Sequence, residues 1–105
     1  MKIDPAEKTH KLLATLWSRN LPIVRERLDL LDRAAETARD ATLTSPLRRD
    51  AAMTAHKLAG SLGMFGYSEG THIARKLEVL FDDIAPPDPQ HIADLASQLR
   101  SSLHL

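Results

Sequence analysis

Apolar residues recur at intervals of three or four along most of this chain, and proline, glycine and asparagine interrupt the pattern at a few places. Such spacing is typical of amphipathic α-helices, because it gathers the apolar side chains on one helix face. The interruptions separate five segments, which cover about residues 4–19, 21–42, 45–65, 68–84 and 88–104. Amphipathic helices that are joined by short connections favour a helix bundle. We therefore expect an all-α protein.

The last four segments are expected to form the body of the fold. They predict an antiparallel up-and-down four-helix bundle over about residues 21–104, within a single domain of residues 1–105. Asn20 and Pro22 indicate a break in front of this bundle. The segment of about residues 4–19 is therefore expected to be an additional N-terminal helix that caps one end of the bundle.

Three single residues carry more local expectations. Trp17 is expected to pack into the bundle and to hold the N-terminal helix there. Gly66 is a good helix stop, because glycine readily adopts the left-handed conformation that ends many helices. Ile84 falls on the apolar face of the fourth segment, so we expect it to be buried.

Composition excludes several classes of function. The chain has 14 basic and 14 acidic side chains, so it lacks the positive field that attracts nucleic acids and anionic membranes. It has no cysteine, and its histidines and carboxylates form no recognised metal motif. No apolar run is long enough to span a bilayer, and the N-terminus MKIDPAEKTHK lacks an apolar signal core. We expect a monomeric, cytoplasmic protein without a metal or other cofactor of its own.

The third segment carries an unusual face around His56. At about 100° per residue, its large apolar side chains point to the core and the imidazole of His56 points the opposite way. The residues around the histidine are all small: Ala52, Ala59, Gly60 and Gly63. A solvent-exposed helix face normally carries long polar side chains, and each glycine in a helix costs about 1 kcal/mol relative to alanine. The pattern therefore calls for a reason other than helix stability.

An exposed imidazole among short side chains is a group that another protein can approach. A concave site can close over His56, and Gly60, one turn further on, permits the closest approach of a partner's backbone. Met53 and Met64 flank this face and can supply adaptable apolar contact, and Lys57 can swing toward a phosphate. Two other interpretations remain open, namely an ordinary surface histidine and glycines that let two helices pack closely.

The string AHKLAGSLGMFG, residues 55–66, resembles the phosphoacceptor motif of histidine-phosphotransfer (Hpt) domains. The motif has a histidine, a short apolar step, a glycine four residues on, then small residues and a further glycine. In this chain these are His56, Leu58, Gly60, Ser61 and Gly63. The runs GMFGY and IARKLE also look like the family, and the resemblance is specific across roughly residues 50–81. The family's fold is a four-helix bundle with an accessory N-terminal helix.

The resemblance implies a phosphoryl carrier. The family's histidine exchanges a phosphoryl group with an aspartate of a receiver domain, so His56 would be the phosphoacceptor, through Nε2. A neutral imidazole nitrogen is a suitable nucleophile for this step. The Mg²⁺ ion would belong to the receiver, and the chain has no glycine-rich loop that could hold ATP, so it is not expected to be an enzyme. The implied partners are response-regulator receiver domains, hybrid histidine kinases, or both.

The chain departs from the family's pattern at one position and follows one of its branches at another. Many members have a lysine three residues after the histidine, where it can screen the phosphate charge. Ala59 stands there, and Lys57 is the available substitute. In the chemotaxis-kinase branch, a glutamate of the next helix accepts a hydrogen bond from the histidine ring and fixes its tautomer, and Glu78 occupies the matching place. A surface ion pair of Glu78 with Lys76 or Arg75 is the other interpretation.

Two alternatives accompany the phosphorelay prediction. The run GMFGY, residues 63–67, also fits the phosphorylatable domain of a larger chemotaxis-type histidine kinase. A docking domain that keeps the fold and is never phosphorylated is the second alternative, and the missing lysine at Ala59 supports it.

Overall fold

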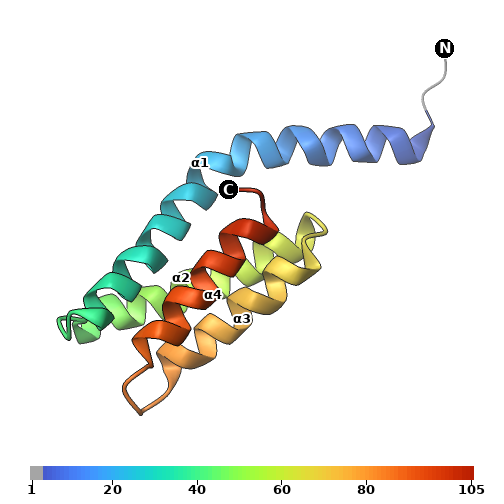
Figure 1. Ribbon diagram of the computed structural model, residues 1–105. Helices are drawn as coiled ribbons and strands as arrows, with labels where there is room; N and C mark the ends of the chain where they lie inside the picture. The colour runs from blue at the N-terminus through green and yellow to red at the C-terminus, as the bar shows by residue number, and fades with distance from the viewer. Residues whose placement is uncertain (1–3) are drawn as a thin grey trace.

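The computed structural model describes residues 4–105, and within them it contains helices and no strand. The four helices are α1 (Pro5–Arg39), α2 (Ser45–Met64), α3 (Ser68–Asp82) and α4 (Pro89–Ser102) (Figure 1). Each helix packs against the next one along the chain, and α4 packs against α1. The helices therefore form a closed ring of neighbours around one core, and the predicted all-helical class is confirmed.

The predicted break between two N-terminal helices is wrong, because α1 runs without interruption from Pro5 to Arg39. Pro22 lies inside it, where the missing N–H removes one helical hydrogen bond and bends the helix without ending it. Figure 1 shows α1 changing direction part-way along its length. Asn20 lies within this continuous helix, and its Nδ2 donates to Ser61 Oγ of α2 at 3.4 Å.

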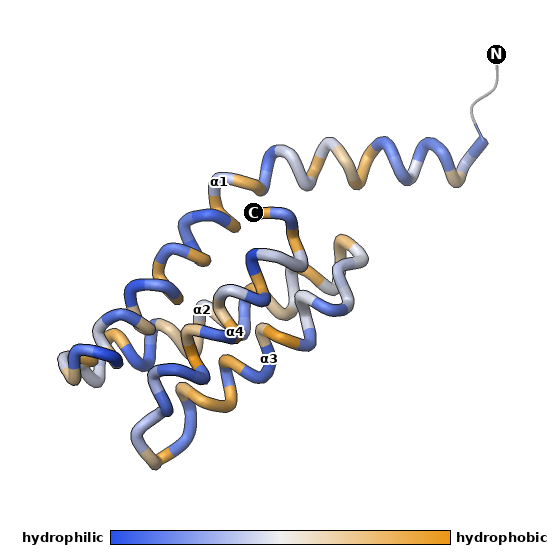
Figure 2. Tube along the Cα trace, in the orientation of Figure 1, coloured by the Kyte–Doolittle hydropathy of each residue, from blue (hydrophilic) through white to orange (hydrophobic). Residues whose placement is uncertain are grey.

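The first part of α1 is not a cap on the bundle. It projects past the ends of the other helices (Figure 1), so the molecule measures 59 × 21 × 20 Å. Residues 4–12 are exposed, and this stretch is mostly hydrophilic in Figure 2. Trp17 marks the point of attachment, as expected, because its ring packs against Phe65 and Tyr67 with centroid distances of 5.3 and 4.7 Å. An amphipathic pattern alone does not show whether a helix folds back or extends onward.

The core is made of aliphatic side chains and Phe81, and it contains no buried polar residue among those described. Burying one leucine, isoleucine or valine side chain stabilises a fold by about 1.5–3 kcal/mol. The largest fully buried side chains come from all four helices: Val24, Leu28, Leu31, Leu58, Leu62, Leu77, Ile92 and Leu99. In contrast, α2 contributes four buried alanines, which we call the alanine row: Ala51, Ala52, Ala55 and Ala59. Such short side chains let neighbouring helices approach closely.

Polar contacts fasten the helices at their surfaces. Arg100 of α4 donates to Asp32 Oδ2 from both Nε and Nη2, at 2.9 and 2.7 Å, and its Nη2 also donates to Asp29 Oδ1 at 2.7 Å. Burial acts to lower the pKa of Arg100, but the hydrogen bonds to Asp32 and Asp29 and their negative charges raise it above the usual value. Arg48 of α2 likewise donates to the carbonyls of Phe81 and Ala85, both at 2.8 Å.

Proline ends α3 earlier than its apolar pattern predicts. The helix stops at Asp82, ahead of Pro86 and Pro87, whose rings cannot continue a helix. Ile84 lies in the connection to α4 and is 99% exposed, so the expectation that it joins the apolar face of α3 is wrong.

Gly66 ends α2 as the sequence predicts, and two backbone hydrogen bonds that differ from the regular helical pattern close the helix there. It has φ of +85°, a conformation that costs other residues about 1–2 kcal/mol. The amide of Tyr67 donates to the Leu62 carbonyl at 2.9 Å, and the amide of Gly66 donates to the Gly63 carbonyl at 3.2 Å. This arrangement is the Schellman motif, and it turns the chain directly into α3.

Two glycine-to-alanine substitutions should change stability in opposite directions. Gly66→Ala should lower the free energy of unfolding by about 1 kcal/mol, because alanine must adopt the left-handed conformation. Gly60→Ala should raise it by about the same amount, because Gly60 is helical and an added Cβ meets no heavy atom within 4 Å. Thermal melting should show the two midpoints about 4 °C below and above that of the unmodified protein.

Each variant is the control for the other, because both add one methyl group to α2 or its end. Equal shifts in the same direction would contradict the assignment of left-handed strain to Gly66 and of open space to Gly60.

Candidate functional site

His56 lies on α2 with its imidazole largely in solvent, since 72% of the side-chain surface is exposed. Its Nδ1 lies 2.8 Å from Oε1 of Glu78, which comes from α3 and is 25% exposed. A carboxylate can only accept a hydrogen bond, so Nδ1 carries the proton in this pair. In a neutral imidazole the lone pair then resides on Nε2. The structure thus brings together the two residues that the sequence singled out, and it leaves one ring nitrogen available for chemistry.

The close packing of α3 on α2 holds this pair in place. The Thr71 hydroxyl of α3 donates to the Ala59 carbonyl of α2 at 3.0 Å. Ala52 and Ala59, expected on the exposed face around His56, are instead buried, with 7% and 4% of their surface exposed. Neither residue is therefore open to a partner. The helical wheel located them correctly beside the histidine, but it cannot show that a neighbouring helix covers that side of α2.

The two glycines near His56 stay exposed, and their surroundings differ. A Cβ added to Gly63 would lie 3.4 Å from the Thr71 hydroxyl, so this position faces α3. A Cβ added to Gly60 would meet no heavy atom within 4 Å. Close helix packing therefore gives no reason for glycine at position 60, whereas the approach of another molecule would give one.

The other flank of the His56 face combines apolar and positive side chains. Met53 and Met64 are exposed to 60% and 65%, and Lys57 is exposed as well. Exposed methionines provide flexible, polarisable surface that adapts to different partners. Among the described residues, no ion pair includes Lys57. These three residues and Gly60 are exposed around His56.

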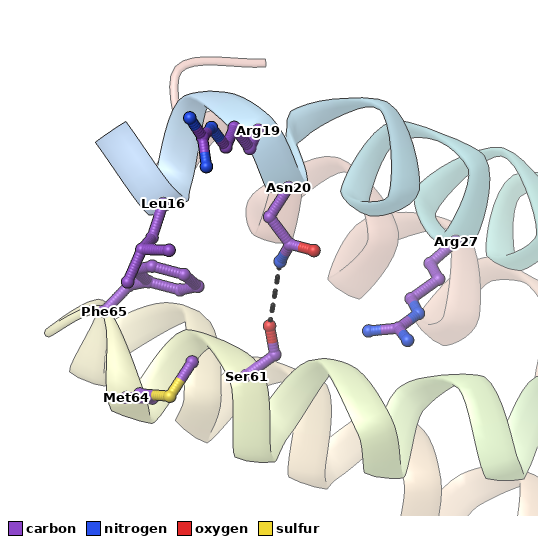
Figure 3. A pocket seen from close by; sticks show the side chains of 7 residues that line it. All are labelled: Leu16, Arg19, Asn20, Arg27, Ser61, Met64 and Phe65. Atoms are coloured by element: carbon purple, nitrogen blue, oxygen red, sulfur yellow. Dashed lines mark hydrogen bonds between the residues drawn. The ribbon is translucent and has the colours of Figure 1, made fainter. Parts of the chain in front are cut away.

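A groove between α1 and α2 continues this surface (Figure 3). Leu16, Met64 and Phe65 provide its apolar part, and Arg19 and Arg27 add positive charge from α1. The hydrogen bond from Asn20 to Ser61 crosses the groove (Figure 3). The residue pattern does not predict this groove, because it indicates a separate helix for the first part of α1.

A hollow of about 270 Å³ lies on the α3 side of the histidine. Its lining comprises His56, Ala59, Gly60, Arg75 and Glu78. Lys57, the substitute expected for the missing lysine, is not among these residues. Arg75 does line the hollow, although the sequence suggested this residue only as a surface ion-pair partner for Glu78. The spacing of Arg75 and Glu78, three residues apart on one helix, is the signal that places both on the same face.

Other kinds of site find no support in the part of the chain that the structure describes. Between residues 4 and 105, no group of three or more histidine, aspartate or glutamate side chains is arranged to hold a metal ion. None of the helices there has the length and apolar character needed to cross a membrane.

Comparison with known proteins agrees with the resemblance seen around His56. The sequence model of the family described as the Hpt domain matches residues 15–104, which contain α2, α3, α4 and most of α1. The chain is also 32% identical over 90 residues to Protein RcaC of Microchaete diplosiphon, a match that covers 83% of this chain and 14% of RcaC. No solved structure matches the chain at a significant level. The match over most of its length shows that this chain belongs to the Hpt domain family.

Proposed function

We propose that His56 is the phosphoacceptor of a phosphorelay, and that it exchanges a phosphoryl group with aspartates of receiver domains. Membership of the Hpt domain family assigns the chain a general role in phosphoryl transfer. The observation that carries the specific proposal is the exposed imidazole, whose Nδ1 is bonded to Glu78 while Nε2 is free. The open space above Gly60 supports it, because a receiver must bring its aspartyl phosphate to the ring.

The transfer step needs one nucleophilic nitrogen and a proton that stays in place. The Nε2 lone pair attacks the phosphorus of the aspartyl phosphate, the N–P bond forms, and the P–O bond to the aspartate breaks. The aspartate leaves as a carboxylate with the electron pair of that bond. Because the proton remains on Nδ1, the ring gains positive charge during the step. The reverse sequence returns the phosphoryl group to an aspartate.

Glu78 supports this step in two ways. Its carboxylate holds the proton on Nδ1, and therefore keeps the nucleophilic lone pair on Nε2. The same negative charge stabilises the positive ring that forms as the N–P bond is made. Glu78 does not touch the phosphoryl group in this scheme, so it is a positioning residue for His56.

The partner supplies the remainder of the site. Mg²⁺ and the phosphorylated aspartate belong to the receiver domain, and this chain contributes the nucleophile and a docking surface. We assign that surface to Gly60, Gly63, Met53, Met64 and Lys57, which are exposed around His56. An up-and-down bundle that acts as a monomer fits this role, because α2 then presents its outer face directly to the receiver.

A second candidate function places the same histidine in a larger kinase. The chain spans 14% of the length of RcaC, so Hpt-like segments occur within much longer proteins. The Glu78–His56 contact favours the phosphorylatable domain of a chemotaxis-type histidine kinase, because that branch of the family has a glutamate at the matching place. His56 would then receive its phosphoryl group from ATP held by another domain. A docking domain that is never phosphorylated would keep the surface and lose the transfer.

Replacing the histidine should abolish labelling. The protein is incubated with a panel of phosphorylated receiver domains, and acid-labile, base-stable label is measured on the unmodified chain and on His56→Gln. We expect label on the unmodified chain and none on His56→Gln, because His56 is the histidine that lines this site among the described residues.

The matched control is His91→Gln, since His91 is exposed on α4 and outside the site. It should be labelled like the unmodified chain. A folded protein that accepts no label from any receiver, but does accept it from a histidine kinase with ATP, would support the kinase alternative. No label from either donor would leave only the docking alternative.

Two substitutions of Glu78 should distinguish the effect of its negative charge on transfer from the effect of its hydrogen bond on the His56 tautomer. Glu78→Gln keeps an acceptor for Nδ1–H, so the ring ¹⁵N shifts should still report the proton on Nδ1. Glu78→Ala removes the acceptor, so the two tautomers should mix. Transfer should slow by about tenfold or more in both variants, because a hydrogen bond to a charged group is worth about 1.5–3 kcal/mol.

Glu69→Gln is the control, because Glu69 is an exposed carboxylate on the same helix. Its tautomer signals and transfer rate should match those of the unmodified chain. Unchanged tautomer and rate in both Glu78 variants would exclude the role proposed for this residue.

A further inference from the structure

We propose that Arg75 holds the phosphoryl group on His56, and so takes the place of the lysine that Hpt domains carry three residues after the histidine. The inference rests on the proposed function, because it concerns the phosphorylated form of His56. It adds a phosphate ligand from α3, a helix in which the sequence suggested only Glu78 as a contributor to the site.

The phosphorylated site needs a positive charge on this side of the histidine. A phosphoryl group carries nearly two negative charges near neutral pH, and the Glu78 carboxylate already lies 2.8 Å from the other nitrogen of the same ring. Two anionic groups on one imidazole repel each other unless a cation lies close by. Ala59 offers no charge and is 96% covered by its surroundings, since only 4% of its surface is exposed.

Arg75 is the cationic residue of the hollow beside His56. It lines that space together with His56, Gly60 and Glu78, whereas Lys57 does not. The buried Ala59 leaves the hollow open to a long side chain from α3. A guanidinium group also suits the task, because its planar N–H groups can bind two phosphate oxygens at once.

The arginine is free to make this contact. Its side chain is exposed, and none of the ion pairs between residues 4 and 105 includes it. Glu78, Asp82 and Asp83 share the next hollow along α3 with Arg75, and it forms no ion pair with any of them. Glu78 is engaged with His56. Arg75 therefore stands next to the phosphorylation site without a competing fixed partner.

The test measures how the phosphate on His56 titrates. Phosphoramidate, a small chemical donor, phosphorylates imidazole as ammonia leaves, so no receiver is needed. The ³¹P signal of phospho-His56 is identified by its absence in His56→Gln and is followed against pH at low ionic strength. A cation about 6 Å away through a water-like medium already changes a pKa by about half a unit, and a cation in direct contact changes it by more.

Arg75→Gln should raise the phosphate pKa by at least about half a unit, because the cation that favours the doubly charged form is gone. Arg75→Lys should recover most of the effect. Lys57→Gln is the matched comparison, since it removes one exposed positive charge from the other flank, and it should shift the pKa less than Arg75→Gln does. High salt should shrink the difference between Arg75→Gln and the unmodified chain.

Two outcomes would overturn the inference: a phosphate pKa in Arg75→Gln equal to that of the unmodified chain, or a shift in Lys57→Gln at least as large as in Arg75→Gln. Neither outcome touches the proposed function, which the labelling by receivers decides separately. If phosphoramidate labels His56 and no receiver does, the proposed relay fails while the role of Arg75 is still measured.

Discussion

The packing of α3 against α2 is the interaction on which the rest of this protein depends. The alanine row of α2 allows α3 to come close, and the Thr71 hydroxyl bonds to the Ala59 carbonyl at the point of approach. Glu78 then reaches His56 from the neighbouring helix at 2.8 Å. With bulkier side chains in the alanine row, the helices would stand further apart and the carboxylate would no longer reach the ring. The geometry of the site thus depends on the small side chains that are buried between α2 and α3.

The same packing explains why the histidine face is asymmetric. On one side of His56, α3 covers the alanines and supplies the charged residues Glu78 and Arg75. On the other side, Met53, Met64 and Lys57 face solvent, and the groove between α2 and α1 begins at Met64. In the proposed relay the first side controls the proton and the phosphate charge, and the second side meets the receiver. On the proposed function, the two sides of one helix face thus have different roles, phosphoryl transfer on one side and partner binding on the other.

The residue pattern was sufficient to predict features that depend on neighbouring residues in the sequence. Apolar spacing indicated the helices, Gly66 indicated the end of α2, and the place of His56 opposite the large apolar side chains indicated its exposure. It was insufficient for features that depend on packing against a segment distant in the sequence. Pro22 bends α1 and does not end it, and the helix extends beyond the bundle instead of folding over it. The burial of Ala59 and the position of Arg75 depend on how α3 sits, which no periodicity within α2 contains.

The short turn at Gly66 has a consequence for how the molecule assembles. His56 and Glu78 are 22 positions apart, and the turn that joins their helices closes a small loop, whereas Arg100 and the aspartates of α1 are 68 and 71 positions apart. Closing a shorter loop costs less chain entropy. The helical hairpin of α2 and α3 can therefore form early in folding, and it can persist in native-state fluctuations that detach α1. The proposed phosphorylation site would then belong to the part of the protein that opens last.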